Sequence, residues 1–146
     1  MIQGLGDMNI SLVLSAIGSA FGTCVAGMAA IGAWKRAFTQ SKAAPFILVT
    51  FVGAPLSQTF YGLLVRDAIA KAVWPEGTML IQFLIGALAG AAIGTSAYLQ
   101  GKEGAKAADA LGETGKGFTN YLMVIGIIET VAIFVMVFVT MAMPKG

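Results

Sequence analysis

Hydrophobic residues gather along the chain in four long stretches that are separated by short polar segments. The stretches cover residues 9–34, 45–65, 78–99 and 118–143. A helix needs about 20 apolar residues to cross the hydrocarbon core of a bilayer, and each stretch is close to that length. We therefore predict an all-α membrane protein with four transmembrane helices.

The composition supports this prediction and excludes several classes of function. Hydrophobic residues make up 58% of the 146 residues and charged residues only 11%, whereas soluble domains carry about 25% charged residues. Too little chain remains for a nucleotide-binding or hydrolytic domain, so we expect no enzyme activity in this chain by itself. The sequence has no His and a single Cys, which gives no support to haem or transition-metal sites. We expect Cys24, inside the first stretch, to be a buried thiol.

The first and third helices carry small residues at every fourth position. These residues are Gly18, Gly22, Ala26 and Ala30 in the first helix and Gly86, Gly90 and Gly94 in the third. Such stripes let helix backbones approach closely in a membrane. The second and fourth helices are bulkier and rich in Phe, Val, Ile and Met. This alternation suits an inner layer of thin helices and an outer layer of thicker ones in a closed ring of identical copies.

The two halves of the chain look like a duplication. Aligning Ser57-Gln58-Thr59 with Ile128-Glu129-Thr130 brings the hairpins into register, so that Gln58 takes the place of Glu129. We predict a first transmembrane hairpin over residues 1–74 and a second over residues 75–146. On this plan only the second hairpin keeps an ionisable residue.

Glu129 is the only charged residue in the fourth apolar stretch. A charge at the bilayer centre costs roughly 2.5–3.5 kcal/mol on insertion scales, so ionisable residues there usually have a function. Glu129 is therefore the first candidate for the functional site.

Oxygen-bearing side chains are predicted at a similar membrane depth. Pro55 should kink the second helix and free carbonyl oxygens close by. Ser57 and Gln58 follow it, Tyr61 lies one turn beyond Gln58, and Gln100 ends the third apolar stretch. These groups are ligands that a hard cation prefers. With one acid available, a monovalent ion would leave the site neutral, whereas Ca²⁺ or Mg²⁺ would leave excess charge in hydrocarbon.

Simpler roles exist for the same polar residues. Ser and Thr in membrane helices commonly bond their own backbone, and a single Gln can join two helices. Gln100 could also mark the cytoplasmic end of the third helix.

The basic residues predict the orientation of the chain. Six of the nine lie in the connections after the first and third helices and three on the opposite side: Lys35, Arg36, Lys42, Lys102, Lys106 and Lys116 against Arg66, Lys71 and Lys145. The positive-inside rule places the first group in the cytoplasm and both termini on the non-cytoplasmic side. We expect a multi-pass protein of a bacterial or archaeal cell membrane. The second of these connections also carries acids, which suits a protein partner better than nucleic acid.

Three motifs occur in order along this scaffold. Pro-x-Ser/Thr-Gln-x-x-Tyr-Gly matches Pro55, Ser57, Gln58, Tyr61 and Gly62; Gln-Gly-Lys matches Gln100, Gly101 and Lys102; Glu-Thr-x-Ala-Ile matches Glu129, Thr130, Ala132 and Ile133. With these motifs the chain resembles, over nearly its whole length, the rotor-ring proteolipid of V-type and archaeal-type ATPases. This proteolipid is also called the K subunit or a c-type subunit.

The resemblance implies a site and a set of partners. The ligands of Na⁺ would be Glu129, Ser57, Gln58, Gln100 and the backbone carbonyl of Ala54, with Tyr61, Pro55 and Thr130 around them. Ser57 stands where Thr is usual, and Arg66 and Asp67 stand where a longer apolar run is expected. The implied partners are identical copies in a ring, a membrane stator subunit with half-channels and an Arg, central-stalk subunits on the cytoplasmic side, and the lipid bilayer. No nucleic acid and no cofactor besides the ion are implied.

Three hypotheses remain open. The first is a rotor ring that carries Na⁺, and the second is the same ring carrying H⁺. The third is a small proton-coupled four-helix exporter, which would require neither a duplicated hairpin nor a small-residue stripe. Ring copy number, and whether the machine runs as a pump or a synthase, are also open.

Overall fold

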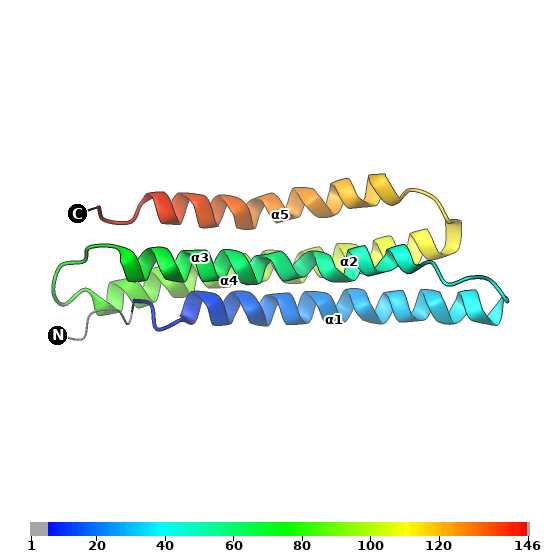
Figure 1. The fold of residues 1–146 in the computed structure, drawn as a ribbon, viewed down its shortest axis with the longest axis horizontal. Helices are drawn as coiled ribbons and strands as arrows, with labels where there is room; N and C mark the ends of the chain where they lie inside the picture. The colour runs from blue at the N-terminus through cyan, green and yellow to red at the C-terminus, as the bar shows by residue number, and fades with distance from the viewer. Residues whose placement is uncertain (1–5, 146) are drawn as a thin grey trace.

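The computed structural model describes residues 6–145, and helices are the only regular elements in that part of the chain (Figure 1). The elements are α1 (Ile10–Thr39), the 3-10 turn η1 (Phe46–Leu48), α2 (Val49–Gly53), the 3-10 turn η2 (Ala54–Leu56), α3 (Ser57–Lys71), α4 (Met79–Thr114) and α5 (Phe118–Met141). Within residues 6–145, four segments are long and apolar enough to cross a membrane: Ile10–Thr39, Phe46–Lys71, Met79–Thr114 and Phe118–Met141. The prediction of an all-α protein with four such helices is confirmed.

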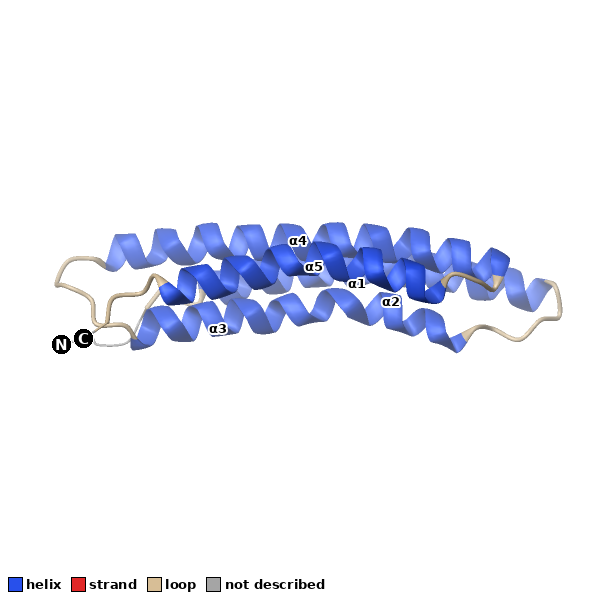
Figure 2. Ribbon diagram, turned by 90° about the horizontal axis from the view of Figure 1, so that it is seen from above, coloured by secondary structure: helices blue, strands red, loops and turns tan. Residues whose placement is uncertain are grey.

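The helices lie lengthwise beside one another and form an elongated bundle (Figures 1 and 2). The start of α1, the end of α3, the start of α4 and the end of α5 share one end of the bundle. The connections after α1 and after α4 share the opposite end. The predicted boundary between hairpins falls between Lys71, where α3 ends, and Met79, where α4 begins. The duplication itself stays a prediction, and residues 1–5 and 146 of its ranges lie outside the described part.

Backbone contact between α1 and α4 forms the centre of the bundle. A Cβ atom added at Gly18 would collide with the backbone of Gly94, and one added at Gly101 would collide with the backbone of Gly22. At Gly90 it would lie 2.7 Å from the backbone of Ser11. The predicted close approach along the small-residue stripes is therefore confirmed.

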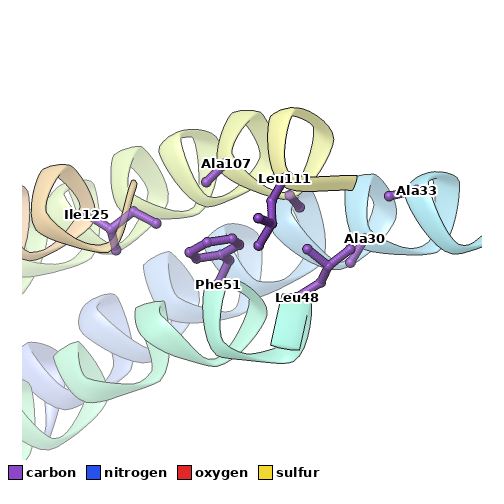
Figure 3. Packing of buried hydrophobic residues seen from close by; sticks show 8 residues of the cluster. Ala30, Ala33, Leu48, Phe51, Ala107, Leu111 and Ile125 are labelled. Carbon is purple, nitrogen blue, oxygen red and sulfur yellow. The ribbon is translucent and has the colours of Figure 1, made fainter. Parts of the chain in front are cut away.

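Two apolar clusters lie at different heights along the bundle. The first joins α1, η1, α2, α4 and α5 through Ala30, Ala33, Leu48, Phe51, Ala107, Ala108, Leu111 and Ile125 (Figure 3). The second joins α3, α4 and α5 through Val65, Ile69, Ala89, Ile93 and Ala132. Along the chain, the polar candidates of each helix lie between its members of the two clusters. Apolar packing therefore covers the site from both ends of the bundle.

α4 is longer than the apolar pattern predicts. The pattern ends it near residue 100 and makes residues 102–114 part of a loop, but the helix continues to Thr114. Helix ends depend on caps as well as hydropathy, and Gly115 ends α4 in the left-handed conformation at φ 66°. Beyond the apolar part, Arg36 of α1 bonds Asp109 of α4, and its other terminal nitrogen lies 3.6 Å from Glu113.

The expectation of a buried Cys24 is wrong. Cys24 is exposed in the chain. It lies two residues from both Gly22 and Ala26, which are buried. Because each residue turns a helix by about 100°, that spacing puts Cys24 on the far side of α1.

The close contact between α1 and α4 can be tested with a matched pair of glycines in α1. Gly18→Ala should lower the thermal unfolding midpoint, because its methyl group meets backbone that cannot rotate away; overpacking of this kind costs about 1–3 kcal/mol. Gly32 has no atom within 4 Å of an added Cβ, so Gly32→Ala should leave the midpoint unchanged or raise it. Circular dichroism of the detergent-solubilised protein measures both. Equal midpoints for the two variants would contradict the close backbone packing of α1 on α4.

Candidate ion-binding site

Pro55 breaks the regular helix between α2 and α3. It is buried inside the 3-10 turn Ala54–Leu56, and the span bends between α2 and α3 (Figure 2). Proline has no N–H, so the carbonyl of Phe51, four residues earlier, loses its helical donor. α4 comes close to this oxygen at Gly104, where a Cβ would lie 2.8 Å away. After the turn, the Ala54 carbonyl lies 3.1 Å from the hydroxyl of Ser57.

The carboxylate of Glu129 receives hydrogen bonds from two other helices. Ser57 and Tyr61 of α3 donate to its Oε1 at 2.6 Å and 2.8 Å. Gln100 of α4 donates through Nε2 to its Oε2 at 3.3 Å. An ionised carboxylate is an acceptor only, and hydrogen bonds to a charged group are stronger than neutral ones. Both oxygens of this half-buried side chain therefore have donors.

Gln58 and Gln100 form a buried pair of amides behind the carboxylate. Both side chains are fully buried, and Gln58 Nε2 donates to Gln100 Oε1 at 2.8 Å. Gln100 Nε2 also donates to the carbonyl of Ile125 at 3.0 Å. A carbonyl can only accept, so this contact orients the Gln100 amide with its nitrogen toward α5 and its oxygen toward Gln58.

The hydroxyl oxygen of Ser57 and its three oxygen neighbours form a cluster of four oxygens. Ser57 Oγ lies 3.1 Å from the Ala54 carbonyl, 3.1 Å from Gln58 Oε1 and 2.6 Å from Glu129 Oε1. The hydroxyl has one hydrogen, so it can satisfy only one of its three neighbours by donation. A small cation could satisfy the others. The described residues contain no cluster of three or more His, Cys, Asp or Glu that could hold a metal.

The structure brings together most of the residues predicted for the site. Ser57, Gln58, Tyr61, Gln100 and Glu129 meet at one point, together with the carbonyl of Ala54 next to Pro55. Thr130 does not join them. It is exposed and donates to the Ile127 carbonyl of its own helix at 2.6 Å, because one residue beyond Glu129 is about 100° further around α5.

Ser96 also reaches the site and was missing from the predicted set. It donates to the carbonyl of Ile128, next to Glu129, at 2.9 Å. Its spacing from Gln100 is the signal that could have found it, since residues four apart on a helix share a face.

Exposed apolar side chains flank the site residues in the sequence of both spans, at Leu56 and Phe60 and at Ile127 and Val131. Ile127 and Val131 are each two residues from Glu129, which places them on the opposite side of α5 from the carboxylate. That side of α5 suits lipid or another membrane helix.

Residues 83–142 match the family model of the ATP synthase C subunit. The matched segment contains most of α4 and all of α5, and with them both Gln100 and Glu129. The comparison with curated proteins gave no match. The predicted resemblance to a rotor proteolipid is confirmed at the level of this family. Most of the second hairpin of this chain is therefore similar to the ATP synthase C subunit, and members of that family are non-catalytic membrane rotor proteins that form rings.

Proposed function

We propose that the chain is the rotor-ring subunit of the membrane sector of a V-type ATPase or ATP synthase, and that it carries Na⁺ at Glu129. Its family supports an ion-translocating rotor proteolipid. The observation that carries the choice of Na⁺ is the group of oxygens around Ser57, which includes the only carboxylate of the site.

The number of oxygens favours sodium over a bare proton. A proton needs the carboxylate and one hydrogen-bond partner, whereas a dehydrated Na⁺ needs several oxygens in place of its water. Ser57 Oγ and the three oxygens within 3.1 Å of it, from Glu129, Gln58 and the Ala54 carbonyl, supply four. Gln100 Oε1, bonded to Gln58 Nε2, supplies a fifth. Tyr61 and Gln100 Nε2 then hold the carboxylate in place.

One Na⁺ and one carboxylate make a neutral site. An uncompensated charge is costly in hydrocarbon, so the loaded site could face lipid while the ring turns. When the ion leaves at a half-channel of the stator, the emptied carboxylate would pair with a stator Arg. The polar parts of α1 and α4 that carry Arg36, Lys102 and Lys106 would face the cytoplasm and the central stalk. Both termini would lie on the opposite side of the membrane. Nucleotide chemistry belongs to partner subunits, and the rotor could serve a pump or a synthase.

The V-type assignment rests on the four-helix plan. Gln58 occupies in the first hairpin the place that Glu129 occupies in the second, so each chain would carry one ion for two hairpins. Gln58 is also bonded into the site through Gln100. In this proposal the first hairpin therefore supplies ligands to the ion at Glu129 and has no ion-carrying carboxylate of its own.

Proton transport is the second candidate. The direct contact of 2.6 Å between Ser57 Oγ and Glu129 Oε1 favours it, because a carboxyl and a hydroxyl can share that bond with no ion between them. The exporter hypothesis has no such support, since the family match describes a rotor protein. Native mass spectrometry separates the two architectures, because an exporter would form a small oligomer of about two chains and a rotor a large ring.

Sodium should protect Glu129 from a hydrophobic carbodiimide. In detergent-solubilised protein at neutral pH, millimolar NaCl should slow modification of Glu129, because the ion occupies the carboxylate that the reagent attacks. KCl at the same ionic strength is the control and should give no protection, since K⁺ is larger than this oxygen cluster suits. Mass spectrometry of the labelled peptide measures the rate. Equal rates in NaCl and KCl at neutral and mildly alkaline pH would reject Na⁺ and favour H⁺.

Gln100→Ala should weaken Na⁺ binding and leave ring assembly intact. It removes one oxygen ligand and one donor to the carboxylate, so the Na⁺ concentration for half-protection should rise at least about tenfold. Gln82→Ala is a matched control on the same helix, because Gln82 bonds Thr78 near the start of α4. It should leave half-protection unchanged. Unchanged Na⁺ affinity in Gln100→Ala would remove Gln100 from the site.

A further inference from the structure

Ser96 links α4 to α5 directly beside the site. Its side chain is 3% exposed, and its hydroxyl donates at 2.9 Å to the carbonyl of Ile128, the residue before Glu129. A serine in a membrane helix usually bonds a carbonyl of its own helix. The neighbouring Thr95 does so, donating to Ala91 at 2.8 Å. Ser96 differs from this pattern because its partner is on another helix.

Ser96 and Gln100 together hold α5 at two points. Gln100, one turn further along α4, donates to the carbonyl of Ile125 at 3.0 Å. The carbonyls of Ile125 and Ile128 are three residues apart, so they share a face of α5 and lie about 4.5 Å apart along its axis. A single hydrogen bond would let α5 turn about the contact. Two bonds from one rigid face oppose both rotation and sliding of α5.

The face of α4 that carries these donors is firmly placed. Gly94, two residues before Ser96, is in backbone contact with α1, as is Ala97 after it. On the α5 side, Ala132 is fully buried one turn beyond Ile128 and packs in the second apolar cluster. A small residue at this position lets the two helices come close enough for the bond from Ser96 to form.

We propose that Ser96 is a positioning residue of the ion site, which sets the rotation of α5 and so the direction of the Glu129 carboxylate. Without the bond, only Gln100 of the two α4 donors would still bond the backbone of α5, and Glu129 Oε1 would lose its fixed distance from Ser57 and Tyr61. Binding sites need their groups within about 0.5 Å and 10–20° of the working geometry. Discrimination between Na⁺ and the smaller Li⁺ depends on that geometry, so the preference for Na⁺ should decrease when the bond from Ser96 to Ile128 is removed. The role in ion discrimination rests on the proposed function, whereas the role in directing Glu129 does not.

The test compares Ser96→Ala with Thr95→Ala in the full chain. Thr95→Ala removes a hydroxyl from the preceding residue of the same helix, which bonds only within α4. The readouts are the concentrations of Na⁺ and Li⁺ for half-protection of Glu129 against carbodiimide, the labelling rate without either ion, and the temperature at which the purified oligomer dissociates. Ser96→Cys is added because it keeps the packing and replaces the hydroxyl by a weak donor.

Both Ser96 variants should raise the Na⁺ concentration for half-protection about three- to tenfold, as loss of one hydrogen bond predicts. They should also lower the preference for Na⁺ over Li⁺. In Thr95→Ala the Na⁺ concentration for half-protection should stay within about twofold of that of the unchanged protein. A shift in dissociation temperature with the same Na⁺ affinity and the same Na⁺/Li⁺ ratio would overturn the proposal, because it would make Ser96 a packing residue only.

The labelling rate without added ions separates this proposal from the choice of Na⁺. If Na⁺ protects neither the variants nor the unchanged protein, the proposed sodium function fails. In that case a faster reaction of Glu129 in Ser96→Ala and Ser96→Cys than in Thr95→Ala would still support the positioning role. Equal rates in all three variants would reject it.

Discussion

The carboxylate of Glu129 lies within an apolar helix bundle, and donors from two other helices make that position tenable. Ser57 and Tyr61 approach one carboxylate oxygen from α3, and Gln100 approaches the other from α4. Burying a charge without hydrogen-bond partners costs far more free energy than the net stabilisation that a single hydrogen bond gives to a folded protein. The relative placement of α3, α4 and α5 is therefore tied to this one group.

The placement of α4 depends in turn on contacts at its opposite face. Small residues let α1 and α4 meet backbone to backbone, which leaves no space for a side chain between Gly18 and Gly94. α4 then presents Ser96 and Gln100 to α5 from a rigid base. Apolar clusters above and below the site keep water from its ends, so that hydrogen bonds inside it are stronger than they would be at a surface. Packing in one part of the bundle thereby supports polar chemistry in another.

Pro55 contributes by removing a hydrogen bond. The 3-10 turn around it brings the Ala54 carbonyl to Ser57, and the freed carbonyl of Phe51 lies close to Gly104. The carbonyl that the missing N–H frees, that of Phe51, is not one of the proposed ion ligands, whereas the proposed carbonyl of Ala54 is placed beside Ser57 by the turn itself. A membrane tolerates such a break only where neighbouring helices cover it, as α4 does here.

Much of the site could be read from residue types, while its geometry could not. The apolar pattern determined the number of helices, the isolated charge identified Glu129, and the motifs around Pro55 and Gln100 identified most of its neighbours. The same pattern ended α4 too early, because a helix can continue through Lys, Glu and Ala beyond the apolar part until a cap such as Gly115 stops it.

Which residues are costly to bury follows from the order of amino acids alone, because hydropathy and proline chemistry are properties of single residues and their near neighbours. The packing of the helices makes Thr130 face away from the site, brings Ser96 to α5, and turns the nitrogen of the Gln100 amide to the Ile125 carbonyl. Each of these depends on how α4 and α5 are rotated against one another. That rotation follows from contacts between residues far apart in the chain, which no local pattern encodes.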